Sequence, residues 1–512
     1  MRYVGLTLKI AVFATGCAGI VAEFVLSTLA TYLSGNAVLQ WTIVMSLMLF
    51  AMGLGSRLSK YFKSHLLDLF LVTELGLSLL CAASAILAYG LFGYTAHIHL
   101  FIYGLAMAIG ILIGFEIPLV TRLNQDYEEL RLNIASVMEK DYFGALVGGL
   151  FFAFVALPYL GLTYTPIVLG SINFLVAAVL LIMFFNLVER KKLIAGLFTL
   201  CFFGLLTLGL TARPIILYGE QRQYRDKIIF AEQTPYQKLV ITRWKDNFWL
   251  YINGQTQFST FDEERYHEPL VHPAMKLAAR NNNILILGGG DGLGLREILK
   301  HKGVQKVTIV DLDPAMTKLA ATHPILQQIN QGSFGDTRVK VVNQDAAAFL
   351  KQDNSYYDVV IADLPDPDTI DLMHVYSLGF YRLIRKHLTR GGVMVTQASS
   401  PYFTRKAFIC IQKTVRAAGF SVLPLHNQIA TMGEWGWVLA VSDDLADEAT
   451  LKRRALKTTF NDLPLKFLNQ DALISMAHFG KDALTGAAEI RINTTVNPVL
   501  HRYYAAGRWD AY

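Results

Sequence analysis

Cysteine is scarce in this chain, and the placement of its four cysteines among 512 residues excludes two classes of protein. Cys17, Cys81 and Cys201 lie in apolar runs, and Cys410 stands alone. This spacing provides neither a disulfide framework nor the paired ligands of a structural zinc site. We therefore expect neither a disulfide-stapled fold nor a metal centre.

Charge is also scarce, because Asp, Glu, Lys and Arg make up only 17% of the residues and the net charge is a modest +6. A nucleic-acid-binding chain usually carries a far stronger basic excess, so we expect no nucleic-acid partner. Hydrophobic residues make up 53% and concentrate before residue 215. The composition predicts a membrane domain followed by a soluble one.

Seven apolar runs before residue 215 are long enough to cross a bilayer. They span about 8–33, 39–56, 67–93, 98–121, 142–163, 166–188 and 193–212. Basic residues gather in alternate connections, after the second, fourth and sixth runs. The positive-inside rule therefore predicts that the N-terminus and these basic connections are cytoplasmic.

The pattern leaves open the side of the membrane on which the soluble part lies. Seven crossings from a cytoplasmic N-terminus place everything after residue 213 outside the cell. Three alternatives remain: one run does not span, the count is wrong, or the domain is external. We favour a cytoplasmic domain, because the reactants inferred below are intracellular metabolites.

Four carboxylates lie within or beside the apolar runs: Glu23, Glu74, Glu116 and Asp141. Such residues often mark a transport or binding site. The simpler interpretation, which we favour, places Glu74 and Asp141 near the interface and pairs Glu23 with Glu116 inside the bundle. Gly110 and Gly114 are expected to serve close helix packing.

The sequence pattern divides the whole chain into four parts. Residues 214–258 form a connector and a small antiparallel β unit, and residues 259–442 form the main domain. Residues 443–512 form a helical extension, and residues 1–213 form the membrane domain. Thr260 and Glu263, at capping-box spacing, predict a helix that begins near Asp262.

The main domain is built around ILILGGGDGLGLREILKH at Ile284–His301. A buried strand enters Gly288, Gly289 and Gly290, then Asp291, and a helix opens near Leu293. This is the first strand–turn–helix of a doubly wound, Rossmann-like sheet, in which glycines let a ligand approach the backbone. The fold class is thus a multi-pass α-helical membrane domain joined to an α/β domain with a small N-terminal β unit.

Each of the next three predicted strands also ends in a carboxylate: Asp311, Asp345 and Asp363, with Asp366 close by. Ligands of open parallel sheets bind beyond the carboxyl ends of the strands, so these side chains should meet in one crevice. A pyrophosphate would be repelled there, which disfavours a nicotinamide dinucleotide. A cationic adenosyl ligand with a cationic co-substrate fits. Helix capping remains a separate explanation for Asp345 or Asp313.

Several motifs in this order resemble the spermidine synthase (polyamine aminopropyltransferase) family. They are TPYQKLVI, ING at Asn253, YHEPLVHP, GGGDGLGLREILKH and D-x-x-D-P at Asp363–Pro367. The resemblance covers about residues 228–442, and the apolar half looks like the multi-pass extension of some bacterial members. It implies an enzyme of the bacterial inner membrane whose partners are a diamine or polyamine and the lipid bilayer, with homo-oligomers as a family tendency.

The resemblance assigns roles position by position. Asp363 matches the catalytic proton acceptor. The amine and aminopropyl contacts match Tyr266, His267, Asp291, Asp363, Leu364, Pro365 and Asp366, and the donor contacts match Gln237, Gly288, Gly289, Gly290, Asp311, Asp345 and Ala346.

The implied reaction transfers an aminopropyl group from decarboxylated S-adenosylmethionine, a co-substrate, to a diamine such as putrescine, giving spermidine and methylthioadenosine. No other cofactor is implied. The chain departs from the family at Asp368-Thr369-Ile370-Asp371 and at Ile429–Gly433, which leaves the acceptor amine open. The alternatives are another adenosyl-dependent transferase, such as a methyltransferase, or a membrane transporter or sensor with a regulatory synthase-like domain.

Overall fold

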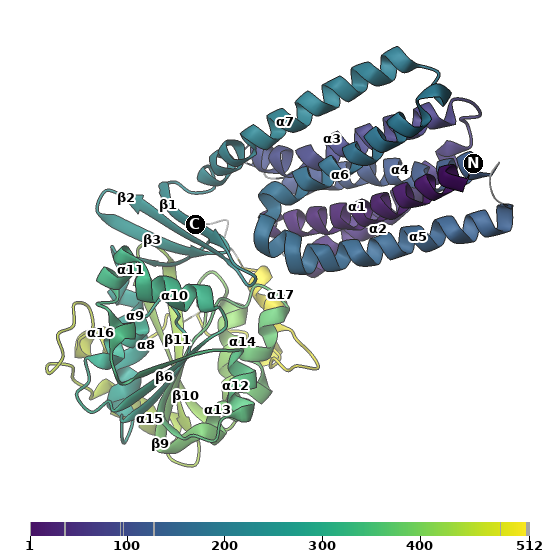
Figure 1. The fold of residues 1–512 in the computed structure, drawn as a ribbon. Helices are drawn as coiled ribbons and strands as arrows, with labels where there is room; N and C mark the ends of the chain where they lie inside the picture. The colour runs from purple at the N-terminus through teal and green to yellow at the C-terminus, as the bar shows by residue number, and fades with distance from the viewer. Residues whose placement is uncertain are drawn as a thin grey trace. The chain divides into compact units, whose positions relative to one another are not determined.

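The computed structural model describes residues 2–34, 37–92, 94–95, 97–125, 129–481 and 483–507. The chain divides into two compact units, Met1–Lys227 and Ile228–Tyr512, and each is described here by itself. Unit 1 is helical, whereas unit 2 holds all the strands among the described residues (Figure 1).

Unit 1 consists of long apolar helices. They are α1 (Arg2–Ser34), α2 (Ala37–Ser59), α3 (Leu66–Phe92), α4 (Ile98–Asn124), α5 (Leu130–Phe151), the π-helix η1 (Phe152–Leu160), α6 (Gly161–Phe184), the short η2 (Phe185–Leu187) and α7 (Lys191–Gln221). Within the described residues, six segments are long and apolar enough to cross a membrane.

The fifth of these segments, Leu130–Leu187, accounts for two of the seven predicted runs. It has 58 residues, far more than the 20 or so that one crossing needs. Gly161 has a φ of +62°, which ends η1, and the Thr165 hydroxyl donates to the Ala156 carbonyl nine residues earlier (3.1 Å). A straight helix cannot make that contact, so the chain reverses here and α6 runs back.

Two boundaries differ from the sequence prediction. The fifth helix begins at Leu130 and not near residue 142. The last helix does not end at Arg213-Pro214 but continues to Gln221. A proline inside a helix removes one hydrogen bond without forbidding continuation, and the apolar residues Ile215, Ile216 and Leu217 extend the pattern beyond it.

The glycines of α4 confirm the expected close helix packing. A Cβ on Gly114 would lie 2.2 Å from the Met52 carbonyl oxygen, and one on Gly110 would lie 2.9 Å from that of Met48. Only glycine lets the backbones of α2 and α4 approach so closely.

Glu74 lies inside the helical bundle of unit 1. Its side chain is fully buried among the helices of unit 1, as is that of Glu116, and Asp141 is half-buried. The apolar pattern around Glu74 on α3 is continuous on all faces, so it does not indicate which face of the helix turns inward.

Unit 2 begins with the predicted small β unit, an antiparallel sheet in the order β1-β2-β3-β4. Its strands are β1 (Lys227–Gln233), β2 (Lys238–Trp244), β3 (Asn247–Ile252) and β4 (Gln255–Ser259). Asn253 and Gly254, both with positive φ, form the tight turn between β3 and β4. Leu239, Leu250 and Phe258 pack this sheet against Leu293 and Met316 of the main domain.

The main sheet has seven strands in the order β10-β11-β9-β8-β5-β6-β7. They are β5 (Asn283–Gly288), β6 (Lys306–Asp311), β7 (Val339–Asn343), β8 (Tyr357–Asp363), β9 (Leu388–Gln397), β10 (Phe420–Ile429) and β11 (Gly433–Ser442). β5 to β9 are parallel, and the hairpin β10–β11 adds an antiparallel edge. The doubly wound fold class is confirmed.

Helices cover both faces of this sheet (Figure 1). Ile284 and Ile286 of β5 face α8 (Glu264–Leu277), α9 (Leu293–Leu299), α15 (Glu448–Leu456) and α16 (Gln470–Met476). Leu285 and Leu287 face α12 (Ala346–Gln352), α13 (Leu378–His387), α14 (Arg405–Ala417) and α17 (Leu500–Ala505). The remaining helical segments are α10 (Pro314–Thr322), α11 (Pro324–Ile329), η3 (Ser333–Gly335), η4 (Asp371–Tyr376) and η5 (Ala487–Glu489).

The predicted capping box is wrong. Helix α8 begins at Glu264, and no side chain caps it. The Thr260 hydroxyl instead accepts from Phe248 N (2.9 Å) and donates to Asn247 Oδ1 (3.2 Å). The Thr260 side chain therefore binds β3 instead of capping the helix, which the local pattern predicts.

Replacing Gly288 by alanine tests the glycine turn. Its φ is +83°, and a Cβ would lie 2.0 Å from the Asp363 carbonyl oxygen. We expect a destabilisation of about 1–3 kcal/mol from the backbone strain alone, with a further cost from the clash. The measurement is the melting temperature of the full-length protein.

Gly294→Ala is the matched control, because Gly294 lies in α9 and an added Cβ would meet no neighbouring atom within 4 Å outside its own helix. It should melt no lower than wild type. Equal melting temperatures for the two variants would contradict the close approach at Gly288.

Candidate active site

The site lies at the carboxyl ends of three neighbouring strands, β6, β5 and β8. Gly288 pairs with Asp363 across β5 and β8, and Asp311 ends β6 on the other side of β5. Parallel strands bring their carboxyl ends to one edge of the sheet. The glycine turn therefore lies between the Asp311 and Asp363 carboxylates, as the sequence predicted.

The glycine turn has no room for side chains. Gly288 and Gly289 have positive φ, and Gly289 N donates to the Asp363 carbonyl (3.0 Å). A Cβ on Gly290 would lie 2.4 Å from Asp311 Oδ2. These three glycines hold backbone directly against the two carboxylate positions, so a ligand at this edge would contact main chain and acid together.

Asp311 is a half-buried carboxyl group in an acidic neighbourhood. Burial first, and then repulsion by the Asp313 and Asp291 charges, raises the pKa of Asp311 to about 6. Its Oδ1 accepts from Asp313 N (2.9 Å), which turns the carboxylate back over the end of β6.

Asp363 and Tyr266 form the central pair of the site. The Tyr266 hydroxyl donates to Asp363 Oδ1 (2.7 Å), and its ring packs against Trp437 and His267. Burial and the Asp291 charge raise the pKa of Asp363 to about 6, although His267 and the Tyr266 hydrogen bond partly oppose this. Asp363 can therefore accept a proton near neutral pH.

His267 supplies a positive charge beside these acids. Its Nδ1 lies 2.9 Å from the Glu263 carbonyl oxygen and 3.0 Å from Glu263 Oε2. Burial alone would lower the pKa of His267, but Glu263, with the Asp291 and Asp363 charges, raises it to about 9. The buried imidazole is therefore protonated at neutral pH.

A buried ion-pair chain holds Glu263 in turn. Arg296 of α9 bonds Glu263 (2.9 Å) through Nη2 and Glu297 (2.8 Å) through Nε. His272 Nε2 lies 2.8 Å from Glu297 Oε2. Charges so deeply buried require partners. This network of ion pairs links α8 and the residue before it to α9.

Asp366 lies beyond Asp363 on a loop held by hydrogen bonds. Its Oδ2 accepts from the Tyr504 hydroxyl (2.9 Å) and its Oδ1 from Gln397 Nε2 (3.3 Å). Burial raises the pKa of Asp366 to about 7, and the Tyr504 hydrogen bond opposes that rise. The Leu364 carbonyl accepts from Gln397 Nε2 (2.9 Å), and the Pro365 carbonyl accepts from the Tyr376 hydroxyl (2.8 Å).

Gln237 reaches the site edge from the small β unit. Its Nε2 donates to Asp313 Oδ2 (3.0 Å), and the Thr234 hydroxyl donates to the same oxygen (2.8 Å). Asp313 also caps α10 by accepting from Ala315 N (2.9 Å). The contact fixes the β unit to the turn that follows Asp311.

Asp345 and Ala346 lie one strand further out, after β7. Asp345 caps α12 through Ala348 N (2.8 Å), and its Oδ2 lies 2.7 Å from His374 Nε2. The capping alternative therefore holds for Asp345 and Asp313. Asp291 Oδ1 likewise accepts from Leu293 N (2.7 Å) at the start of α9, while its charge also acts on Asp311, Asp363 and His267.

Four residues were not predicted from the sequence as part of the site: Glu263, Arg296, Gln397 and Tyr504. Two of them had a signal in the sequence. Arg296 is a basic residue inside the glycine motif, and Glu263 is an acid one helical turn before His267, so an ion pair between them could have been expected. Gln397 is the last residue of β9, which is parallel to β8, so the rule that ligands bind beyond the carboxyl ends of strands would also have placed it at the site. Tyr504 lies 138 residues from Asp366 and had no local signal.

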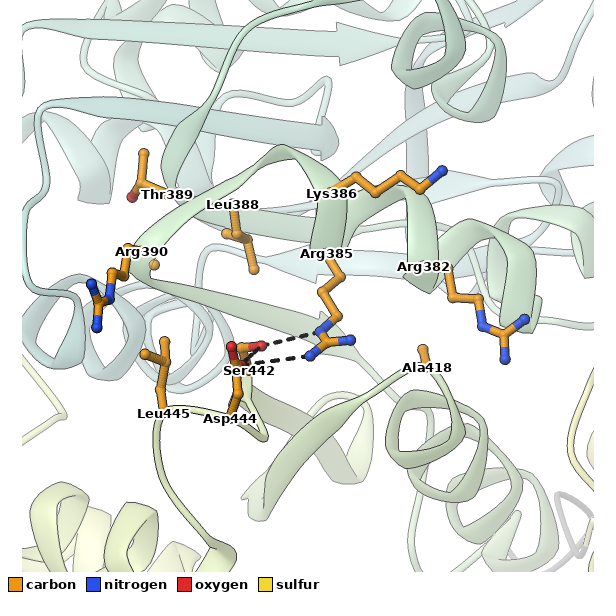
Figure 2. Close-up of a pocket in the computed structure, with 11 residues that line it drawn as sticks. Arg382, Arg385, Lys386, Leu388, Thr389, Arg390, Ala418, Ser442, Asp444 and Leu445 are labelled. Carbon is orange, nitrogen blue, oxygen red and sulfur yellow. Dashed lines mark hydrogen bonds and ion pairs between the residues drawn. The ribbon is translucent and has the colours of Figure 1, made fainter.

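A basic depression of about 710 Å³ lies at the opposite edge of the sheet (Figure 2). Arg382, Lys386 and Arg390 line it at the start of β9 and the end of α13, while Arg385 bonds Ser442 (3.1 Å) and Asp443 (2.9 Å). Its charge has the wrong sign for cationic reactants. Among the described residues, no group of three or more His, Cys, Asp or Glu is placed to hold a metal ion.

Comparison with known proteins decides the family. The chain is 43% identical to polyamine aminopropyltransferase 2 of Aquifex aeolicus over 506 residues, covering 98% of this chain and 99% of that protein. It is 37% identical to the polyamine aminopropyltransferase of Leptospira interrogans, with 97% of each chain covered. The chain belongs to the polyamine aminopropyltransferase family.

The family assignment confirms the resemblance seen in the sequence motifs and the prediction of a spermidine synthase-like enzyme. The spermine/spermidine synthase domain matches residues 263–453, within unit 2. The full-length matches extend through unit 1 as well, so the apolar helices belong to the shared chain. A crystal structure of spermidine synthase in complex with the transition-state analogue AdoDATO aligns with 25% identity and a TM-score of 0.46, covering 50% of this chain and 88% of that one.

Tyr266→Phe tests the hydrogen bond to the predicted proton acceptor. The hydroxyl stabilises the charged form of Asp363, so its removal raises the pKa of Asp363 above about 6. A proton acceptor must be unprotonated, so the acidic limb of the kcat/KM profile should move up by about one pH unit.

Tyr357→Phe is the control, because its hydroxyl bonds Asp353 (2.9 Å) at the other end of β8. The acidic limb of that variant should stay with wild type. A profile of Tyr266→Phe that overlays wild type would show that the hydroxyl does not tune Asp363.

Proposed function

We propose that this enzyme transfers the aminopropyl group of decarboxylated S-adenosylmethionine to a diamine, with putrescine as the first candidate, to give spermidine and methylthioadenosine. The observation that supports this is the hydrogen-bonded Tyr266–Asp363 pair (2.7 Å), which lies close to His267 among several acids at the strand ends. Such a group of acids attracts two cationic reactants and accepts a proton from one of them.

The donor fits the glycine turn and the acids on either side of it. In this proposal Asp311 accepts hydrogen bonds from the ribose hydroxyls, as acids in this position of a doubly wound sheet do. Asp345 and Ala346 border the adenine, and Gln237 contacts the nucleoside. Asp291 faces the ammonium that the donor presents in place of a carboxylate.

The acceptor amine must lose a proton to react, because alkylamines remain protonated near pH 7. Asp363, with a pKa near 6, takes that proton, and Tyr266 holds the receiving carboxylate. The neutral nitrogen then forms a bond to the propyl carbon as the carbon–sulfur bond breaks. The bonding electrons pass to sulfur, which turns the sulfonium into the neutral thioether of methylthioadenosine.

His267 adds a second electrostatic effect. A positive charge close to an alkylammonium disfavours the charged form of the amine, so the imidazolium lowers the amine pKa where it reacts. The Glu263–Arg296 pair keeps that charge fixed in a buried position. The distal ammonium of the diamine then pairs with Asp366, away from His267.

The acceptor pocket has features of its own, and they keep the choice of amine open to experiment. Asp368 Oδ2 accepts from Gln255 Nε2 (2.9 Å), which joins the segment after D-x-x-D-P to the small β unit. The Thr431 hydroxyl donates to Asp262 Oδ1 (2.6 Å), which fixes the loop between β10 and β11. Both contacts lie in segments that depart from the family pattern, and in this proposal they shape the acceptor end of the site.

Unit 1 places the enzyme, in this proposal, in the bacterial cell membrane as a multi-pass protein. Its helices are long and apolar enough to cross a bilayer. We propose a cytoplasmic unit 2, because both reactants are intracellular metabolites, and association between copies of the chain as in related enzymes.

The test uses the purified full-length protein with decarboxylated S-adenosylmethionine and diamines of increasing length. Methylthioadenosine release should require a diamine, and Asp363→Asn should lower kcat by about 10²–10⁴-fold, the usual contribution of a general base. Asp443→Asn, at an exposed turn paired with Arg385, should retain wild-type activity.

Other outcomes point elsewhere. A methylated product formed from undecarboxylated S-adenosylmethionine would support a methyltransferase. Amine flux in vesicles without product formation would support a transporter. Full activity of Asp363→Asn would remove the proton acceptor from the mechanism.

A further inference from the structure

The C-terminal extension reaches the acid-rimmed crevice through one side chain. Tyr504 lies in α17, far beyond residues 263–453 that match the synthase domain. Its hydroxyl donates to Asp366 Oδ2 (2.9 Å), and its side chain is buried. A hydrogen bond to a buried carboxylate is among the stronger ones in proteins, because the charge is poorly solvated.

The extension is fixed in place by Asn493, which is fully buried. Its amide Nδ2 donates to the Met373 carbonyl (3.0 Å) and the Tyr376 carbonyl (3.2 Å). Its Oδ1 accepts from Val499 N (3.1 Å) and Leu500 N (3.4 Å), at the start of α17. One side chain thus ties α17 to η4, the segment that follows the Asp363–Asp366 loop.

Apolar packing supports the same placement. Ile490, Val499, Leu500 and Tyr504 belong to the hydrophobic cluster that covers one face of the main sheet. The extension is therefore part of the fold at this edge, and the position of the Tyr504 hydroxyl is set by packing as well as by hydrogen bonds.

The other groups around Asp366 show what Tyr504 does there. Gln397 donates to the carboxylate, Asp368 repels it, and Tyr376 and Tyr266 lie within electrostatic range. Gln397 holds Oδ1 and Tyr504 holds Oδ2, one oxygen each. A carboxylate accepts about four hydrogen bonds, so lone pairs remain for an ammonium.

We propose that Tyr504 is a positioning residue for the acceptor amine: the C-terminal extension orients the Asp366 carboxylate toward the distal ammonium of the substrate. This rests on the proposed function only in naming a diamine as the ligand. Tyr504 does not touch the reacting atoms, so its effect falls on amine binding and not on donor binding.

The experiment compares full-length Tyr504→Phe with wild type. The KM for the diamine should rise about tenfold, the value of one hydrogen bond to a charged group, while the KM for decarboxylated S-adenosylmethionine stays unchanged. The Tyr504 hydrogen bond lowers the pKa of Asp366, so its loss raises that pKa and should move the acidic limb of the 1/KM profile for the diamine to higher pH. A merely structural role would change neither the ratio of the two KM values nor that limb.

Tyr503→Phe is the matched control on the same helix. The Tyr503 hydroxyl accepts from Arg491 N (3.3 Å), at a distance from Asp366, so that variant loses a hydrogen bond without losing the acid contact. It should keep both KM values. Equal changes in both KM values for Tyr504→Phe, or no change in either, would overturn the proposal.

A binding measurement separates this proposal from the proposed function. Saturating putrescine should raise the melting temperature of wild type and Tyr503→Phe more than that of Tyr504→Phe. This readout needs no turnover. A wild type that releases no methylthioadenosine yet shows this difference would contradict the reaction and keep the amine site, whereas equal amine-induced shifts in all three proteins would overturn the role of Tyr504.

Discussion

The site depends on one electrostatic constraint: several buried or half-buried carboxylates lie together at one edge of a sheet. Burial and mutual repulsion raise the pKa of Asp311, Asp363 and Asp366 well above that of a free carboxyl group. The charged form of such a cluster needs positive charge beside it. His267 supplies part of that charge, held by Glu263 and Arg296, and two cationic reactants would supply the rest. The energetic cost of burying these acids together therefore favours the binding of cations.

The strand ends of this domain follow from the sequence because parallel strands obey simple rules. Each buried apolar run formed one strand, and the acids that end β6 and β8 lie on either side of β5, so Asp311, Asp363 and the glycine turn lie where the pattern placed them. Family motifs added Tyr266 and His267, and their contacts with Asp363 and Glu263 came from packing. The parts that depend on local propensity were harder to place. Thr260 belongs to a hairpin and not to a helix cap, and α7 passes through Pro214.

Long-range contacts lie beyond such reasoning. The sequence around Asp366 does not predict its contact with Tyr504. The sequence around His267 alone does not predict that Arg296 holds Glu263, the partner of the imidazole. The fully buried position of Glu74 is of the same kind, because a helix that is apolar on every face does not say which face turns inward. The helical unit and the α/β unit thus differ in what their sequences reveal. In the sheet, polar residues at strand ends stand out, whereas in the helices the decisive contacts are between backbones at glycines such as Gly114.

The connection between α17 and the crevice has a consequence for biosynthesis. The ribosome makes the strand that carries the acids long before it makes the tyrosine that restrains one of them, 138 residues later. Until the segment with Asn493 and Tyr504 has been made and has packed against η4, the Asp363–Asp366 loop lacks the Tyr504 hydrogen bond. The Asp366 carboxylate therefore acquires its full set of hydrogen bonds only after the segment that carries Asn493 and Tyr504 has been made and has packed against the sheet.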